Sequence, residues 1–145
     1  LLSRGLGDVY KRQIQNQSKS EESLTNERNG GYATISEDEA VAMMSENSAT
    51  LVDVRTAREY ADGHIPGAIN IPVETIGSVK PAGLQGVDEN VSIIVYCRTG
   101  VRSEHASNML LNLGYKHVFD LGGIVDWNGE KVAGTEPGSF AGDAQ

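Results

Sequence analysis

The chain has 145 residues, of which 39% are hydrophobic, and this is enough apolar material for the core of one domain. The charge is uneven: residues 1–29 hold 5 basic and 4 acidic side chains, and residues 30–145 hold 7 basic and 16 acidic ones, a net −9. This acidic, scattered pattern argues against a nucleic-acid surface, and no apolar run approaches the roughly 20 residues of a transmembrane helix.

The first residues predict a leader rather than part of the fold. Residues 1–13 (LLSRGLGDVYKRQ) lack an apolar stretch of signal-peptide length and are more typical of an assembly artefact than of native sequence. Residues 14–31 are rich in Gln, Asn, Ser, Glu and Lys, and such a composition buries too little apolar area to order itself. We therefore expect residues 1–31 to form a disordered leader and tether, residues 32–132 a single domain, and residues 133–145 a flexible tail.

Strand and helix signals alternate through the first half of the domain. In chain order they predict a strand at 32–35, a helix at 36–44 opened by the capping box SEDE, a buried strand at 49–54, a helix at 56–61 and a strand at 68–71. For residues 73–90 we expect a helix plus a loop, because Pro81, Gly83 and Gly86 interrupt any longer element.

The second half contains the clearest strand and the clearest helix. Residues 91–96 (VSIIVY) form a continuous β-branched run, which is typical of a central parallel strand. After a loop at 97–102, Ser103 is expected to cap a helix whose apolar residues recur at helical spacing and which ends at Gly114. A strand at 118–121 and a turn or short helix at 124–127 follow. The alternation predicts an α/β fold with a parallel sheet covered on both faces.

Cys97 lies at the carboxyl end of the strongest strand, where open α/β sheets bind their ligands. The loop that follows runs into a helix N-terminus, whose free N–H groups and dipole stabilise anions, so a thiolate is favoured there. Gly100 allows the backbone to curl so that successive N–H groups face one centre. Arg102 offers a planar fork for the oxygens of an anion, and Arg98 lies at the rim. A buried core thiol is the competing interpretation of the cysteine, and the surrounding loop favours catalysis.

Other polar residues carry weaker signals. Asp53 and Arg55 end a neighbouring strand, where they contribute to the pocket or form an internal ion pair, such as one between Arg55 and Glu59. We assign no catalytic role to His64, which a hydrogen-bonded turn explains equally well. Trp127 is expected to be a packing residue. The three histidines lack metal-ligand spacing and the chain has a single cysteine, so we expect no metal site.

Three blocks together resemble rhodanese-like sulfurtransferases. Residues 97–103 (CRTGVRS) look like the active-site loop of that family, with Arg98, Thr99, Gly100, Val101 and Arg102 in the substrate-binding positions. The segment DVR at 53–55, followed by EY at 59–60 and GHIPGAINIP at 63–72, resembles its amino-terminal motif. LGG at 121–123 with Trp127 resembles its carboxy-terminal motif.

The resemblance implies a three-layer α/β fold with about five parallel strands flanked by helices on both faces. It also implies a ping-pong reaction without a cofactor: Cys97 takes sulfur from a small sulfur-containing anion, such as thiosulfate or polysulfide, or from a persulfide. A thiol, protein or cyanide-like acceptor then removes it. The tether resembles those of exported bacterial rhodaneses, which favours an extracytoplasmic form with membrane contact only through an N-terminal anchor.

Two other functions stay open. Some rhodanese-like domains are non-catalytic or redox-regulatory binding modules, typically where the cysteine is replaced, and this chain keeps it. Cysteine phosphatases and arsenate reductases also place a Cys-loop-Arg cradle before a helix, but with five residues between Cys and Arg. Four residues separate Cys97 from Arg102 here, and the tighter ring suits sulfur transfer better than phosphoryl transfer.

Overall fold

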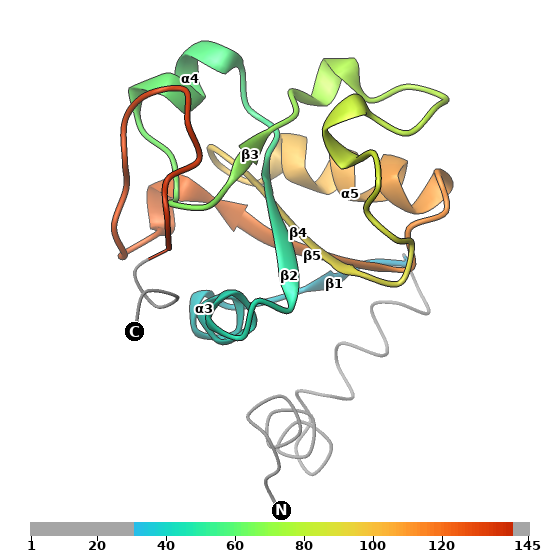
Figure 1. Ribbon diagram of the computed structural model, residues 1–145, viewed down its shortest axis with the longest axis horizontal. Helices are drawn as coiled ribbons and strands as arrows, with labels where there is room; N and C mark the ends of the chain where they lie inside the picture. The colour runs from blue at the N-terminus through green and yellow to red at the C-terminus, as the bar shows by residue number, and fades with distance from the viewer. Residues whose placement is uncertain (1–30, 141–145) are drawn as a thin grey trace, which may run out of the picture.

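The computed structural model describes residues 31–140, so residues 1–30 of the predicted leader (1–31) and residues 141–145 of the predicted tail (133–145) lie outside it. Five parallel strands form one sheet in the order β1-β5-β4-β2-β3 (Figure 1). Their bounds are β1 Ala33–Thr34, β2 Ala49–Asp53, β3 Ile69–Asn70, β4 Ser92–Cys97 and β5 His117–Gly123. The expected parallel α/β sheet is thus confirmed, with the β-branched run at its centre.

Within residues 31–140, three α-helices flank the sheet: α3 (Glu37–Ser45), α4 (Ala57–Asp62) and α5 (Val101–Asn112). Both α3 and α4 begin with a complete capping box, Ser36 with Glu39 and Thr56 with Glu59. α5 lies on one face of the sheet and α3 on the opposite face (Figure 1), as the three-layer arrangement requires. No helix within residues 31–140 has the length and apolar character needed to cross a membrane.

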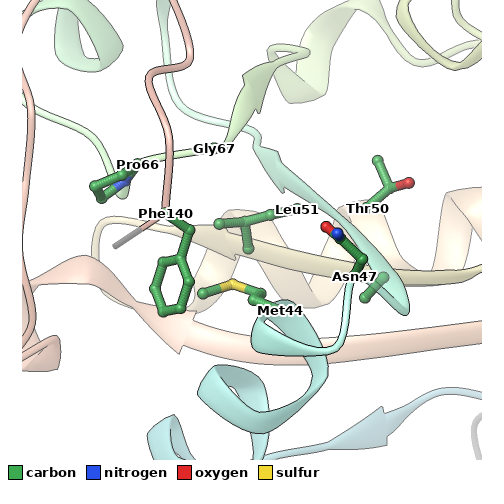
Figure 2. Close-up of a pocket in the computed structure, with 8 residues that line it drawn as sticks. Met44, Asn47, Thr50, Leu51, Pro66, Gly67 and Phe140 are labelled. Carbon is green, nitrogen blue, oxygen red and sulfur yellow. The ribbon is translucent and has the colours of Figure 1, made fainter. Parts of the chain in front are cut away.

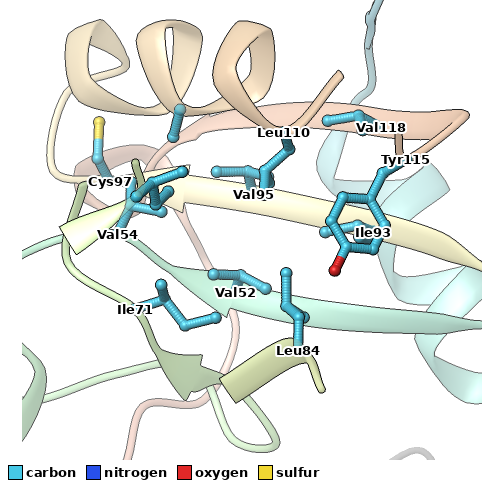
Figure 3. Close-up of a cluster of buried hydrophobic side chains, with 12 residues drawn as sticks. Val52, Val54, Ile71, Leu84, Ile93, Val95, Cys97, Leu110, Tyr115 and Val118 are labelled. Atoms are coloured by element: carbon cyan, nitrogen blue, oxygen red, sulfur yellow. The ribbon is translucent and has the colours of Figure 1, made fainter. Parts of the chain in front are cut away.

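The side chains of β4 alternate between two cores. Ile93, Val95 and Cys97 point toward the layer of α5, where they meet Leu110 and the side chains of β2 (Figure 3). The residues between them, Ile94 and Tyr96, point to the other face. Since β4 is buried on both faces, its place in the sheet is fixed by apolar packing, and this holds Cys97 at a defined position at the edge of the core.

Two segments differ from the sequence-based expectation. Residues 73–90 contain no α-helix, only the 3-10 turns η1 (Val73–Thr75) and η2 (Ala82–Leu84). α5 begins at Val101, directly after Gly100, and the expected cap Ser103 lies inside its first turn. The reason is that Gly100 adopts the left-handed conformation, with φ 113°, and turns the chain straight into the helix. The loop that follows Cys97 is therefore shorter than predicted.

Residues 133–140, which the sequence assigns to the tail, lie along the turn before β3. The N–H of Gly134 donates to the carbonyl of Ala61, and the carbonyl of Pro137 accepts from the N–H of Gly67, both at 2.8 Å. Phe140 lies against Met44 and helps to line a cavity of about 240 Å³ (Figure 2). The short 3-10 turn η3 (Ile124–Asp126) precedes this segment.

Candidate active site

Cys97 is both a core residue and the acceptor of a loop hydrogen bond. It is only 1% exposed and packs in the apolar cluster beneath α5. Its Sγ accepts a hydrogen bond from the backbone N–H of Gly100 at 3.0 Å. The core-thiol interpretation thus describes its surroundings, but a thiol that merely filled space would not need this donor. The Gly100 N–H and the start of α5 together place partial positive charge beside the sulfur.

The end of β5 packs against the backbone of the Cys97 loop. A β-bulge shifts the register between β4 and β5, so that Val95 pairs with Asp120 and Tyr96 with Gly122. The Asp120 carboxylate accepts the N–H of Gly122 at 2.9 Å and holds the bend. This bend brings Gly123 so close to the backbone of Arg98 that a side chain at Gly123 would not fit. Gly123 therefore makes room for the loop, whereas Gly122 supplies the positive φ of 99° that the bend requires.

Arg102 is already paired with a carboxylate. Its Nη1 and Nη2 donate to Oε1 and Oε2 of Glu59 at 2.8 and 3.0 Å. The hydrogen bonds and charge of Arg102 lower the pKa of Glu59 to about 2, and Glu59 in turn raises the pKa of Arg102. The predicted ion pair of Glu59 with Arg55 is wrong: Glu59 lies at the start of α4, which follows β2, and so faces the start of α5, which follows the neighbouring strand β4.

This pair was missed by sequence reasoning, although the signal was available. A helix that follows a parallel strand begins at the carboxyl edge of the sheet. Since β2 and β4 are neighbours, the first turns of α4 and α5 must lie side by side. Glu59, in the first turn of α4, and Arg102, in the first turn of α5, are then close enough to form an ion pair. The pair was missed because the sequence analysis did not consider that β2 and β4 are adjacent in the sheet.

Asp53 and Arg55 form a buried ion pair. Nη2 of Arg55 donates to Oδ2 of Asp53 at 2.6 Å and to the carbonyl oxygen of Gly63 at 2.7 Å. Asp53 is fully buried and Arg55 is 6% exposed. The guanidinium also lies over the ring of Tyr96, 5.7 Å from its centre. Of the two roles that the sequence left open, the geometry therefore supports the internal ion pair, which ties β2 to the turn before β3.

The remaining loop residues form an exposed rim. Arg98, Thr99 and Val101 are exposed, and Val101 shows 73% of its surface to solvent. Arg98 has no ion-pair partner among residues 31–140. Its carbonyl oxygen accepts from the N–H of Val125 at 3.3 Å, which ties the loop to η3. The rim of the Cys97 loop thus carries an exposed arginine.

His64 and Trp127 have packing roles. The fully buried His64 ring stacks on Tyr60 with centroids 3.7 Å apart, and its Nδ1 lies 2.9 Å from the Tyr60 carbonyl oxygen. Nε2 faces the carbonyl of Pro137 at 3.2 Å, so the ring holds the C-terminal segment. Trp127 is 6% exposed and donates to the carbonyl of Glu130. Among the described residues, no three His, Cys, Asp or Glu side chains are grouped to hold a metal ion.

Comparison with known protein families shows to which family this chain belongs. The model of the rhodanese-like domain matches residues 36–130, most of the described chain. The chain belongs to the rhodanese-like domain family. Solved relatives of this rhodanese-like domain include a rhodanese with anions from Escherichia coli, with 37% identity, a TM-score of 0.53, and coverage of 59% of this chain and 99% of that one. The human single-domain sulfurtransferase TSTD1 has 31% identity and a TM-score of 0.55, over 62% and 88%.

Curated relatives of the rhodanese-like domain include sulfurtransferases and tRNA uridine(34) hydroxylases. Thiosulfate sulfurtransferase PspE of Escherichia coli is 38% identical over 87 residues, 57% of this chain and 78% of that protein. The tRNA uridine(34) hydroxylase of Pectobacterium carotovorum is 32% identical over 108 residues, 72% of this chain. The chain spans only 30% of the length of that hydroxylase. The match to sulfurtransferases thus covers most of the relative, whereas the match to the hydroxylase covers one part of it.

Proposed function

We propose that this domain is a sulfurtransferase in which Cys97 carries sulfur as a persulfide. The observation that carries the proposal is the 3.0 Å hydrogen bond from the N–H of Gly100 to the Cys97 Sγ, at the start of α5. An N–H donor and a helix N-terminus favour sulfur that bears negative charge, as a thiolate or a persulfide does. The sulfurtransferase relatives support the same class of reaction.

The reaction has two half-reactions. The Cys97 thiolate attacks the terminal sulfane sulfur of a donor, a new S–S bond forms, and the donor's own S–S bond breaks. With thiosulfate, the electron pair of that bond leaves on sulfite. An external thiolate or cyanide-like nucleophile then attacks the outer sulfur of the persulfide and restores Cys97. Cys97 is the only cysteine in the 145 residues, so no other residue of this sequence takes the sulfur by thiol exchange.

Mass spectrometry of the intact protein tests this proposal. The reduced protein is treated with thiosulfate, with polysulfide and with an organic persulfide, and we expect a gain of one sulfur atom that a thiol reductant removes. Cys97→Ser is the control and should gain nothing. If Cys97 reacts with a small alkylating reagent but no donor transfers sulfur to it, the domain is a binding or regulatory module instead.

A further inference from the structure

We propose that Glu59 sets the charge of the donors that the Cys97 loop accepts, favouring donors with one negative charge over dianions such as thiosulfate. This inference rests on the sulfurtransferase function proposed above. The first observation is that the guanidinium of Arg102 is already bound to a carboxylate. Both terminal nitrogens of that guanidinium donate to the Glu59 carboxylate, at 2.8 and 3.0 Å, so an anion can form the same two-bond contact only by displacing Glu59.

Glu59 is held in place independently of Arg102. As the third helical residue of α4 it completes the capping box: its Oε1 accepts the N–H of Thr56 at 3.0 Å, and its own N–H donates to the Thr56 Oγ1 at 3.2 Å. The lowered pKa of Glu59 keeps it ionised at neutral pH. A donor therefore competes with a carboxylate that is fixed, charged and already desolvated in part, since only 30% of its side chain is exposed.

The charges around the loop also favour a donor with one negative charge. Arg102 and Glu59 neutralise each other, and Glu74 lies near enough to Arg102 to raise its pKa slightly further. That leaves Arg98 as the loop arginine without an ion-pair partner among the described residues. Within the part of the loop that the structure describes, the charge of this arginine matches a donor with one negative charge. A dianion would bring an uncompensated second charge toward Glu59 and Glu74.

Two donors that undergo the same sulfur transfer but differ in net charge test this inference. Thiosulfate and the methanethiosulfonate anion present the same sulfane sulfur, but a methyl group replaces one charged oxygen in the latter. In both cases the Cys97 thiolate bonds to the terminal sulfur and the S–S bond of the donor breaks. Its electron pair leaves on sulfite or on methanesulfinate, respectively. Their relative rate with a small free thiol gives the intrinsic difference in reactivity.

The experiment measures kcat/KM for both donors and compares the thiosulfate-to-thiosulfonate ratio between variants. Glu59→Gln keeps the capping box, because Gln also serves at that position, but removes the negative charge. We expect its ratio to rise about three- to tenfold, in line with the strength of a partly exposed ion pair. Arg102→Gln leaves the Glu59 charge unpaired and should lower the ratio, which tests the same pair in the opposite direction.

A matched control is Glu89→Gln. It removes a carboxylate from another surface ion pair, the one with Lys80, and leaves the loop untouched. Its ratio should equal that of the wild type. If the ratio stays the same in Glu59→Gln and Arg102→Gln while both donors still load Cys97, the donor-charge inference is overturned and the sulfurtransferase function stands. If only polysulfide or an organic persulfide loads wild-type Cys97, the donor-charge inference alone is overturned. If none of these donors loads it, the sulfurtransferase function itself fails.

Discussion

Replacing Gly123 with alanine should displace the loop that follows Cys97. A Cβ at Gly123 would lie 2.3 Å from the carbonyl oxygen of Arg98 and 2.7 Å from the Cα of Thr99. Non-bonded carbon atoms in good contact are about 3.5–4.0 Å apart, so the loop or the end of β5 must move by about 1 Å. Both neighbours are backbone atoms, and therefore no side-chain rotation can relieve the clash.

The size of the effect follows from two separate costs. Overpacking of this kind typically costs about 1–3 kcal/mol of unfolding free energy, and each kcal/mol lowers the melting temperature of a domain of this size by about 4–8 °C. A shift of the loop also moves the Gly100 N–H relative to the Cys97 Sγ, and a misplacement of about 1 Å at a reacting centre can cost about 100-fold in rate. Sulfur loading should thus suffer more than stability does.

Thermal unfolding followed by circular dichroism and the rate of persulfide formation followed by intact mass provide the two readouts. Gly77→Ala is the control, because its Cβ meets no atom within 4 Å and its φ is not in the left-handed region. We expect the control to match the wild type in both measurements. A Gly123→Ala protein with wild-type stability and loading rate would show that the contact between β5 and the loop does not position Cys97.

Three further predictions concern the buried and paired groups. Asp53→Asn should lower the free energy of unfolding in urea by about 3–5 kcal/mol, because it leaves the Arg55 charge buried without its partner; an effect below about 1 kcal/mol would contradict this. The pKa of Glu59 falls from 4.5 to about 2 on folding, so its contribution to stability is present above pH 4.5 and lost toward pH 2. The stability difference between wild type and Glu59→Gln, about 1 kcal/mol after solvent screening, should therefore disappear over that range in urea titrations. Tyr115→Phe should leave stability unchanged or raise it, because the buried hydroxyl has no hydrogen-bond partner among the described residues, and a clear loss of melting temperature would refute this.

The order of the elements was predictable because their signals are local. The run at 91–96 indicated a buried strand, and the capping box at Ser36 marked the start of α3 correctly. The start of α5 was placed too late, because Ser103 is a common cap residue and nothing in the sequence shows that Gly100 has φ 113°. The helix predicted within residues 73–90 is absent, and the 3-10 turns found there could not be predicted because such short turns have no apolar periodicity of their own.

The sequence by itself determined the α/β fold, the place of Cys97 at the end of the central strand, and the loop of glycine and arginines that follows it. These features depend on residues close to one another in the chain. Only the tertiary structure decided which charges are free. Arg102 is paired with Glu59, 43 residues earlier, and Arg55 is paired with Asp53. Arg98 has no ion-pair partner within residues 31–140. The pairing of Arg102 with Glu59 depends on which strands are neighbours in the sheet, and that order arises from the packing of the whole core rather than from any local pattern.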